Sequence, residues 1–337
     1  MVVSYRKAPM GKLPLTLACG PYDRTEALRT GAVQPEGIDL KYVVIQSPPE
    51  IFVRMIRNQE FDVSEMSSAV YLRRRAKGDF PFVAIPVFPS RMFRHSFVFV
   101  NTKSGIKTAK DLEGRRVGVP AYGQTAAVWI RGILKDEYGA AWEKMRWFVG
   151  GLEESRPTDE LDERPAADFS LEFIGEAQTL SGMLESGELD ALLGAIQPSC
   201  FGRSPHVQRL FPNARETERE YYRKTGVFPI MHTLVIREAV YKQDPWIAES
   251  LFRAFQQAKE LCLRQAHYSA ALRYTLPWLL SELEEMDALF SPDPWPYGLE
   301  ANRKTLETLT RYLVDQRLLD RAVGIEELFA PVAAFHA

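Results

Sequence analysis

Two arginines and a histidine lie close together in the stretch PVFPSRMFRHSFVFVN, at Arg91, Arg94 and His95. The apolar runs on either side, 82–88 and 97–100, are typical of buried strands. Cations at the end of a buried strand cost free energy unless an anion meets them. Arginine binds a carboxylate through two parallel hydrogen bonds, so this turn predicts a carboxylate-binding site. A surface turn with solvated arginines is the alternative at this stage.

Proton transfer is the second chemistry that the sequence can supply. His95 and His232 both occur at predicted strand positions beside apolar residues, and imidazole titrates near neutral pH. We expect a catalytic role in proton transfer for both, with a hydrogen-bonded core histidine as the alternative for each. We assign no role to the other histidines, which are His206, His267 and His336.

Two carboxylates stand where a predicted strand passes into a predicted helix. Asp23 follows the strand LPLTLAC, and Glu65 follows the short strand FDV. We predict that both are catalytic, either as acids or as partners that orient a histidine. The competing explanation is that they are acidic residues favoured at the start of a helix by capping and by the helix dipole.

The elements that must position these residues alternate between strands and helices. Strands are predicted at 13–19, 38–45 and 61–63, and the third runs directly into a helix that begins with SEMSS. Further along, 205–226 shows helix and loop without a strand pattern, and the charged stretch 154–169 is typical of a loop.

This alternation predicts an α/β fold with mostly parallel sheets covered on both faces. We expect two doubly wound lobes. The first comprises 12–100 and 226–337, including a C-terminal helical extension, and the second comprises 101–225. Ligands bind beyond the carboxyl ends of strands in such sheets, so we expect a ligand cleft between the lobes.

The bulk composition excludes several classes of function. The 337 residues are 46% hydrophobic and 26% charged, as in ordinary globular proteins. The net charge of -2 does not indicate binding to nucleic acid or to an anionic membrane. No apolar run is long enough to span a membrane, and no signal-peptide pattern precedes the first strand. With three cysteines and no CxxC pair, we expect a cytoplasmic protein whose partners are small molecules or other protein chains.

A metal site is the alternative to purely organic catalysis. No HxH or HExxH spacing occurs, and a site would have to combine Asp23, Glu65, His95 and His232 from distant segments. We therefore expect no cofactor, with a divalent metal as the less favoured possibility.

Several phrases, in order along almost the whole chain, resemble the 4,5-dihydroxyphthalate decarboxylase family. They are LACGPYDRTEAL, PEGIDL, FDVSEMSSAVYL, FVAIPVFPSRMFRHSFVFV, DLEGRRVGVP, TAAVWIRGIL, TGVFPIMHTLVIR and WPYGLEANR. The resemblance implies a type II periplasmic-binding-protein-like fold without export. It also implies non-oxidative decarboxylation of 4,5-dihydroxyphthalate to 3,4-dihydroxybenzoate (protocatechuate) and CO2, in phthalate degradation, without an organic cofactor.

Such a reaction needs an acid at one ring carbon, a base near one hydroxyl and a grip on the carboxylate that is retained. Beside the two arginines, hydroxyl groups suit the polar oxygens of an aromatic dicarboxylate, and aromatic rings suit its planar ring. We expect these substrate-binding residues to be Tyr22, Ser67, Ser68, Phe93, Thr125 and Ser199.

A solute-binding protein of the same fold for an aromatic carboxylate is the competing function, because fold alone does not determine function. The histidines beside the arginines favour the enzyme. The family likeness and the helical tail with its tryptophans lead us to expect a homo-oligomer.

Overall fold

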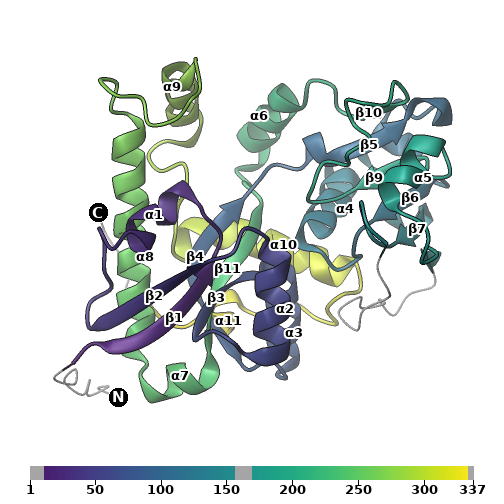
Figure 1. The fold of residues 1–337 in the computed structure, drawn as a ribbon. Helices are drawn as coiled ribbons and strands as arrows, with labels where there is room; N and C mark the ends of the chain where they lie inside the picture. The colour runs from purple at the N-terminus through teal and green to yellow at the C-terminus, as the bar shows by residue number, and fades with distance from the viewer. Residues whose placement is uncertain (1–10, 156–168, 333–337) are drawn as a thin grey trace. The chain divides into compact units, whose positions relative to one another are not determined.

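The computed structural model describes residues 11–155 and 169–332, so most of the charged stretch predicted as a loop lies outside the described residues. The chain forms two compact units (Figure 1). The first comprises the chain up to Arg91, His232–Leu306 and the residues from Val323 onward, and the second comprises Met92–Met231 and Glu307–Ala322. Each unit contains a β-sheet and helices and is described by itself.

Five strands form the sheet of the first unit, in the order β2 (Ile38–Val44), β1 (Leu13–Cys19), β3 (Val63–Ser67), β11 (Ile230–Arg237) and β4 (Phe82–Arg91). β1 runs parallel to β2 and to β3, whereas β11 is antiparallel to β3. The sheet is therefore mixed, with an antiparallel pairing beside the parallel pairings that the sequence predicted. β11 returns to the first unit after the chain has built most of the second, and it enters in the opposite direction.

The third strand extends further than the sequence indicated. Val63–Ser67 is one continuous strand in which every residue is buried, so the helix begins at Ser68 and not directly after Val63. Its sequence, VSEMS, is too polar for the usual pattern of a buried strand. Pairing with β1 on one edge and β11 on the other supplies the backbone partners that hold it extended.

The helices of the first unit pack on this sheet and on one another. α2 contacts β3 and β1, α3 contacts β3 and β4, and the long α8 contacts β4 and α1 (Figure 1). Their bounds are α1 (Glu26–Arg29), α2 (Pro48–Asn58), α3 (Ser68–Lys77), α7 (Glu238–Gln243), α8 (Trp246–Ala266), α9 (Leu279–Phe290) and α11 (Ile325–Leu328).

The second unit has a six-stranded mixed sheet, in the order β10 (Val207–Arg209), β5 (Val98–Asn101), β9 (Ala191–Leu193), β6 (Arg116–Val119), β7 (Arg146–Val149) and β8 (Leu171–Phe173). β6 is parallel to β7 and β9, while β5 is antiparallel to β9 and β10. β10 lies where the sequence showed no strand pattern, so that prediction is wrong. Three residues that pair with β5 at the edge of a sheet are too few to show a period.

Helices α4 (Thr125–Tyr138), α5 (Leu180–Ser186) and α6 (Ala214–Thr225) belong to the second unit, together with the part of α10 (Arg303–Asp315) that follows Leu306. α4 and α10 are in close contact. Tyr312 packs edge-on against Trp129 at 5.5 Å, and its hydroxyl donates to Asp136 at 2.9 Å. In the described residues, no helix is long and apolar enough to cross a membrane.

A substitution at Gly132 would test the packing of α4 against α10, because a Cβ at this position would lie 2.2 Å from the Tyr312 ring. Replacing a glycine inside a helix with alanine ordinarily stabilises a protein by about 0.5–1 kcal/mol. Here we expect overpacking to dominate, so that Gly132→Ala lowers the free energy of unfolding by about 1–3 kcal/mol in urea denaturation. In a Tyr312→Ala background the same change should be neutral or stabilising. Equal destabilisation in both backgrounds would contradict the contact.

Candidate active site

Glu65 lies in the middle of β3 and its side chain is completely buried. Its carboxylate accepts hydrogen bonds from the end of the neighbouring strand β1. The Gly20 N–H donates to Oε2 at 3.0 Å and the Tyr22 hydroxyl donates to Oε1 at 2.5 Å, while Cys19 Sγ lies 3.5 Å from Oε2. A buried charge requires such donors, so the end of β1 and the centre of β3 form one polar site inside an apolar sheet.

His232 completes this site from the other side of β3. β11 places His232 opposite Ser67 and Leu234 opposite Glu65, so the imidazole and the carboxylate are diagonal neighbours on one face of the sheet. His232 Nδ1 lies 2.5 Å from Glu65 Oε1. The ring of Phe52, from α2, meets the imidazole edge-on at 5.0 Å. We call Tyr22, Glu65 and His232 the Glu65 group.

The Glu65 group keeps its carboxylate ionised. Burial by itself would raise the pKa of Glu65, but the nearby His232 and the hydrogen bonds from His232, Tyr22 and Gly20 outweigh burial, and the pKa is lowered. Burial, reinforced by the negative charge of Glu65, raises the pKa of Tyr22 well above its ordinary value. Tyr22 therefore stays a phenol and a hydrogen-bond donor.

His232 is the member of the Glu65 group that a ligand can reach. Its side chain is 18% exposed, whereas that of Glu65 is 0% exposed. Glu65 engages Nδ1, which leaves Nε2 as the ring nitrogen that is not bound to Glu65. The predicted catalytic residues Glu65 and His232 are therefore brought together.

Two serines predicted to bind substrate lie where β3 ends and α3 begins. Ser67 is the last residue of β3, directly opposite His232, and Ser68 is the first residue of α3. Ser68 is 2% exposed, and its hydroxyl makes no hydrogen bond within the described residues. A buried hydroxyl at the N-terminal end of a helix, where backbone N–H groups point outward, is suited to a carboxylate oxygen.

Arg91 also belongs to the first unit, at the end of β4 and not in a turn. It is buried, and its Nη2 donates to the Pro296 carbonyl at 2.7 Å and to the Asn302 side chain. These contacts join β4 to the segment before α10. They show at least one side of the guanidinium bound to protein acceptors and so weaken the prediction that Arg91 grips the substrate.

Asp23 lies outside the Glu65 group. Its carboxylate accepts hydrogen bonds from the backbone N–H and Nη1 of Arg24 and from the Tyr274 hydroxyl. Burial would raise the pKa of Asp23, but Arg24 and these hydrogen bonds lower it. The structure thus shows an ionised partner of Arg24 where the sequence predicted a catalytic acid.

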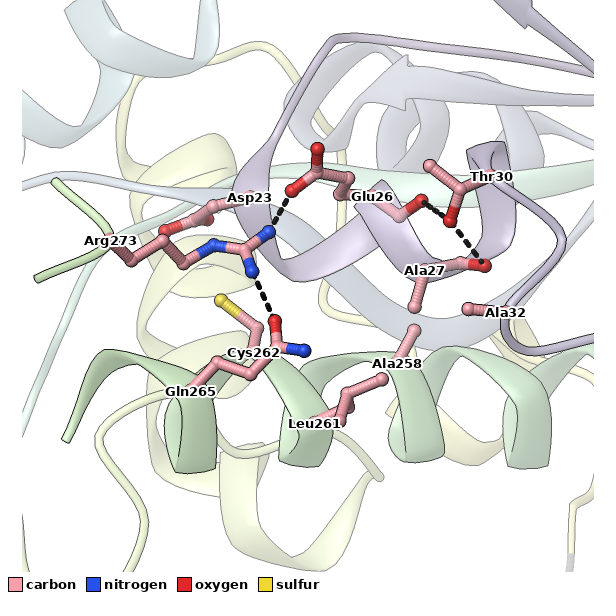
Figure 2. A pocket seen from close by; sticks show the side chains of 10 residues that line it. All are labelled: Asp23, Glu26, Ala27, Thr30, Ala32, Ala258, Leu261, Cys262, Gln265 and Arg273. Carbon is pink, nitrogen blue, oxygen red and sulfur yellow. Dashed lines mark hydrogen bonds and ion pairs between the residues drawn. The ribbon is translucent and has the colours of Figure 1, made fainter. Parts of the chain in front are cut away.

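Asp23 faces a cavity of about 230 Å³ (Figure 2). Arg273 lies between Glu26 and Gln265 in this cavity and interacts with both. The lining therefore presents two carboxylates and one guanidinium. A dicarboxylate would meet net negative charge there, so we do not identify this cavity as a site for such a ligand.

Arg94 lies in the second unit and is 4% exposed. Its Nε donates to Met231 Sδ at 3.1 Å and its Nη1 to the Ala195 carbonyl at 3.3 Å, both weak or neutral acceptors. Burial lowers the pKa of Arg94 to about 10, although the Glu218 carboxylate acts in the opposite direction. In the part of the chain that the structure describes, Arg94 forms no ion pair, and a buried cation of this kind favours an anionic ligand.

His95 lies in the same unit inside an aromatic cluster. Its ring packs edge-on against Tyr138, Phe211 and Tyr221 at 5.3–6.0 Å, and neither ring nitrogen has a hydrogen-bond partner among the described residues. The side chain is 2% exposed, and burial lowers its pKa to about 4. A neutral, enclosed imidazole is a poor proton donor near neutral pH, which argues against the predicted catalytic role.

The remaining predicted binding residues are in the second unit. Phe93 stacks on Phe228 with ring centroids 4.6 Å apart. Thr125 is the buried first residue of α4. Ser199 donates its N–H and its hydroxyl to Glu153, at 2.7 and 2.5 Å. Phe93 and Ser199 therefore have protein partners that the sequence did not indicate.

Two residues near the Glu65 group were not predicted. Phe52 belongs to α2, and its contact with His232 joins segments that are far apart in the sequence. Arg24 follows Tyr22 by two residues, and its guanidinium lies 4.4 Å from the Tyr22 ring. An arginine so close in sequence to a tyrosine is a signal that could have identified Arg24. No group of three or more potential metal ligands occurs among the described residues.

Known proteins share this architecture. Residues 30–155 match the family model described as ABC transporter, phosphonate, periplasmic substrate-binding protein. The periplasmic aliphatic sulphonate binding protein of Escherichia coli is similar over 95% of this chain and 98% of its own, with a TM-score of 0.53 and 11% identity. The alkanesulfonate-binding protein of Xanthomonas axonopodis pv. citri bound to MOPS is similar over 96% and 100%, with a TM-score of 0.54 and 12% identity.

The fold is thus that of the type II periplasmic-binding-protein-like class, as predicted, here with a buried Glu–His pair. The 4,5-dihydroxyphthalate decarboxylase of Comamonas testosteroni is 37% identical over 325 residues, which cover 96% of this chain and 98% of that protein. The enzyme of the same name from Pseudomonas putida is 40% identical over 64% of this chain and 83% of its own. The chain belongs to the 4,5-dihydroxyphthalate decarboxylase family, which confirms the resemblance.

From the lowered pKa of His95 we predict how the free energy of unfolding depends on pH. The His95 imidazole takes up a proton near pH 6.5 in the unfolded chain but only near pH 4 in the folded protein. The free energy of unfolding should therefore fall as the pH is lowered from 6.5 to 4, by roughly 3 kcal/mol at most. His95→Phe retains the aromatic packing and removes the titration, so denaturation curves from pH 4 to 7.5 should show a smaller loss at acidic pH. His206→Gln is the control, and an identical pH dependence in His95→Phe would contradict the prediction.

Proposed function

We propose that this protein is a carboxy-lyase that converts 4,5-dihydroxyphthalate to 3,4-dihydroxybenzoate and CO2. Its curated relatives carry the name of this enzyme. The observation that carries the proposal is the partly exposed His232 imidazole, held at Nδ1 by the buried Glu65 carboxylate. Decarboxylation consumes one proton at a ring carbon, and this is the kind of group that can deliver it.

The proposed step begins with His232 as an imidazolium. Its Nε2–H protonates the ring carbon that bears the leaving carboxylate, while the hydroxyl para to that carbon donates electron density and stabilises the cationic ring. The bond to the carboxylate then breaks, CO2 leaves, and the electron pair of this bond restores the aromatic ring. His232 regains its proton from solvent. Glu65 stabilises the imidazolium and fixes the orientation of the ring.

Neutral donors are suited to hold a substrate carboxylate near His232. Ser67 lies opposite His232, and the buried hydroxyl of the next residue, Ser68, makes no hydrogen bond within the described residues. A cation on the departing carboxylate would stabilise the ground state and slow its loss, so hydroxyl and backbone N–H groups fit this role better. We propose Arg94 as a ligand of the carboxylate that is retained.

We propose that the reaction uses no cofactor, and that the protein is cytoplasmic. All three cysteines are buried free thiols, which is typical of a reducing compartment. Self-association is a further proposal, which light scattering on the purified protein would test.

The activity is tested by incubating the purified protein with 4,5-dihydroxyphthalate and following CO2 and ultraviolet absorbance. We expect turnover that a chelator leaves unchanged. His232→Gln should lower kcat by about 10²–10⁴-fold, because it removes the transferable proton, with little change in KM. His206→Gln is the matched control. Tight binding without CO2 release would instead support a solute-binding protein, and loss of activity with the chelator would contradict the cofactor-free reaction.

Arg94 gives a separate prediction about binding. Arg94→Gln removes the charge and retains part of the hydrogen bonding, so KM for the dicarboxylate should rise by about tenfold or more, as for loss of a charge-assisted hydrogen bond worth about 1.5–3 kcal/mol. The Arg209→Gln variant, on β10 of the same unit, is the control. An unchanged KM would contradict the assignment of Arg94 to the substrate.

A further inference from the structure

The aromatic ring of Tyr22 is held by Arg24, a residue with no role in the chemistry described above. The centre of the Arg24 guanidinium lies 4.4 Å from the Tyr22 ring centroid and 4.1 Å from the Trp295 ring centroid. A guanidinium within this distance of an aromatic face is attracted to it. One cation therefore joins the ring that contacts Glu65 to a ring from the segment between α9 and α10.

Each nitrogen of the Arg24 guanidinium already donates to the protein. Nε and Nη2 donate to the Pro89 carbonyl at 2.7 and 2.5 Å, and Nη1 donates to Asp23 at 3.0 Å. The side chain is 16% exposed. These contacts leave Arg24 poorly placed to bind a substrate carboxylate through its planar fork and well placed to hold its neighbours.

Trp295 is itself fixed at both ends. Its indole Nε1 donates to the Phe88 carbonyl at 2.9 Å, and its backbone N–H donates to Asp293 at 2.8 Å. The buried Lys259 of α8 binds Asp293 and donates to the Trp295 carbonyl. The sequence phrase WPYGLEANR begins at Trp295, and these contacts explain its first residue physically, because they attach a rigid tryptophan to β4.

We infer that Arg24, supported by Trp295, is a positioning residue of the decarboxylase, and that it holds Tyr22 so that the phenol donates to Glu65. This inference rests on the function proposed above for the Glu65 group. The contacts form one series within the first unit. They lead from the β4 carbonyls through Trp295 and Arg24 to Tyr22 and Glu65, whose Oε1 also contacts His232.

The position of Tyr22 matters because Glu65 Oε1 is shared. Tyr22 and His232 both lie 2.5 Å from this oxygen. If Tyr22 is displaced, the buried carboxylate loses a donor that helps to lower its pKa, and it takes up a proton at a higher pH. A protonated Glu65 no longer stabilises the imidazolium of His232. Disturbing Arg24 should therefore change both the rate and its dependence on pH.

The experiment compares Arg24→Met, Tyr22→Phe and the double variant in kcat, KM and the pH profile of kcat/KM. For each single variant we expect kcat to fall about 10- to 100-fold, as when a catalytic group is misplaced by about 1 Å, with KM within about twofold. The acid limb of the profile should move to higher pH. Because Arg24 acts through Tyr22, the double variant should be no worse than Tyr22→Phe alone.

The control is Arg54→Met, which removes another arginine of the first unit that lies over an aromatic ring, here Phe61 at 5.0 Å. It should leave kcat and the pH profile unchanged. Multiplicative losses in the double variant would overturn the inference. A rise in KM at constant kcat in Arg24→Met would also overturn it, since Arg24 would then bind substrate directly.

A readout without turnover separates this inference from the proposed function. Circular dichroism first verifies that each variant is folded. The NMR titration of the His232 imidazole should then change in the same way in Arg24→Met and Tyr22→Phe. If the parent protein releases no CO2 but the two titrations change together, the function is wrong and the positioning role is correct. If the parent protein is active and the titration of Arg24→Met equals that of the parent, the positioning role is wrong.

Discussion

The structure of the first unit depends on one buried negative charge. Glu65 sits in the centre of a sheet with none of its side chain exposed, where an uncompensated carboxylate would be very costly. Its donors come from the end of β1 and from β11, which are the two strands on either side of β3. The strand order therefore does more than build a core, because it gives the charge of Glu65 hydrogen-bond partners on both oxygens. A strand as polar as VSEMS is stable in this place for the same reason.

His95 and His232 show how surroundings decide what a histidine can do. Both follow apolar residues in sequence and have the same intrinsic chemistry. His95 is enclosed by aromatic rings, without a hydrogen-bond partner in the described residues, and burial lowers its pKa to about 4. His232 keeps one ring nitrogen on an ionised carboxylate and part of its side chain exposed. The first environment favours a neutral, enclosed ring, whereas in the second the imidazole contacts a carboxylate and is partly exposed, which is why proton transfer is proposed for His232 and not for His95.

Local patterns in the sequence were sufficient for much of the fold and for the identity of the central pair. The strand 13–19 matches its prediction because its apolar residues form the expected pattern of a buried strand. β3 and β10 did not match, since one is a buried strand of mainly polar residues and the other is a three-residue edge strand. Glu65 and His232 were each selected by residue type and position. Their contact could not be predicted, because it depends on the antiparallel pairing of segments 167 residues apart. Arg91 and Asp23 show the converse: a charged residue can have its partners within the protein.

The fold is shared with proteins that bind sulphonates, and the difference between binding and catalysis must lie in the site. Holding an anion requires only donors, such as hydroxyls, backbone N–H groups and arginine, none of which needs to change its protonation state. Breaking a bond between carbon and a carboxylate requires a group that delivers a proton and then recovers it. In the proposed function that group is His232, which is held by the Glu65 carboxylate, and the lowered pKa of Glu65 favours the charged form of this carboxylate. The hydrogen bond from Tyr22 contributes to this lowered pKa, and the inferred role of Arg24 and Trp295 is to hold the residue that supplies it.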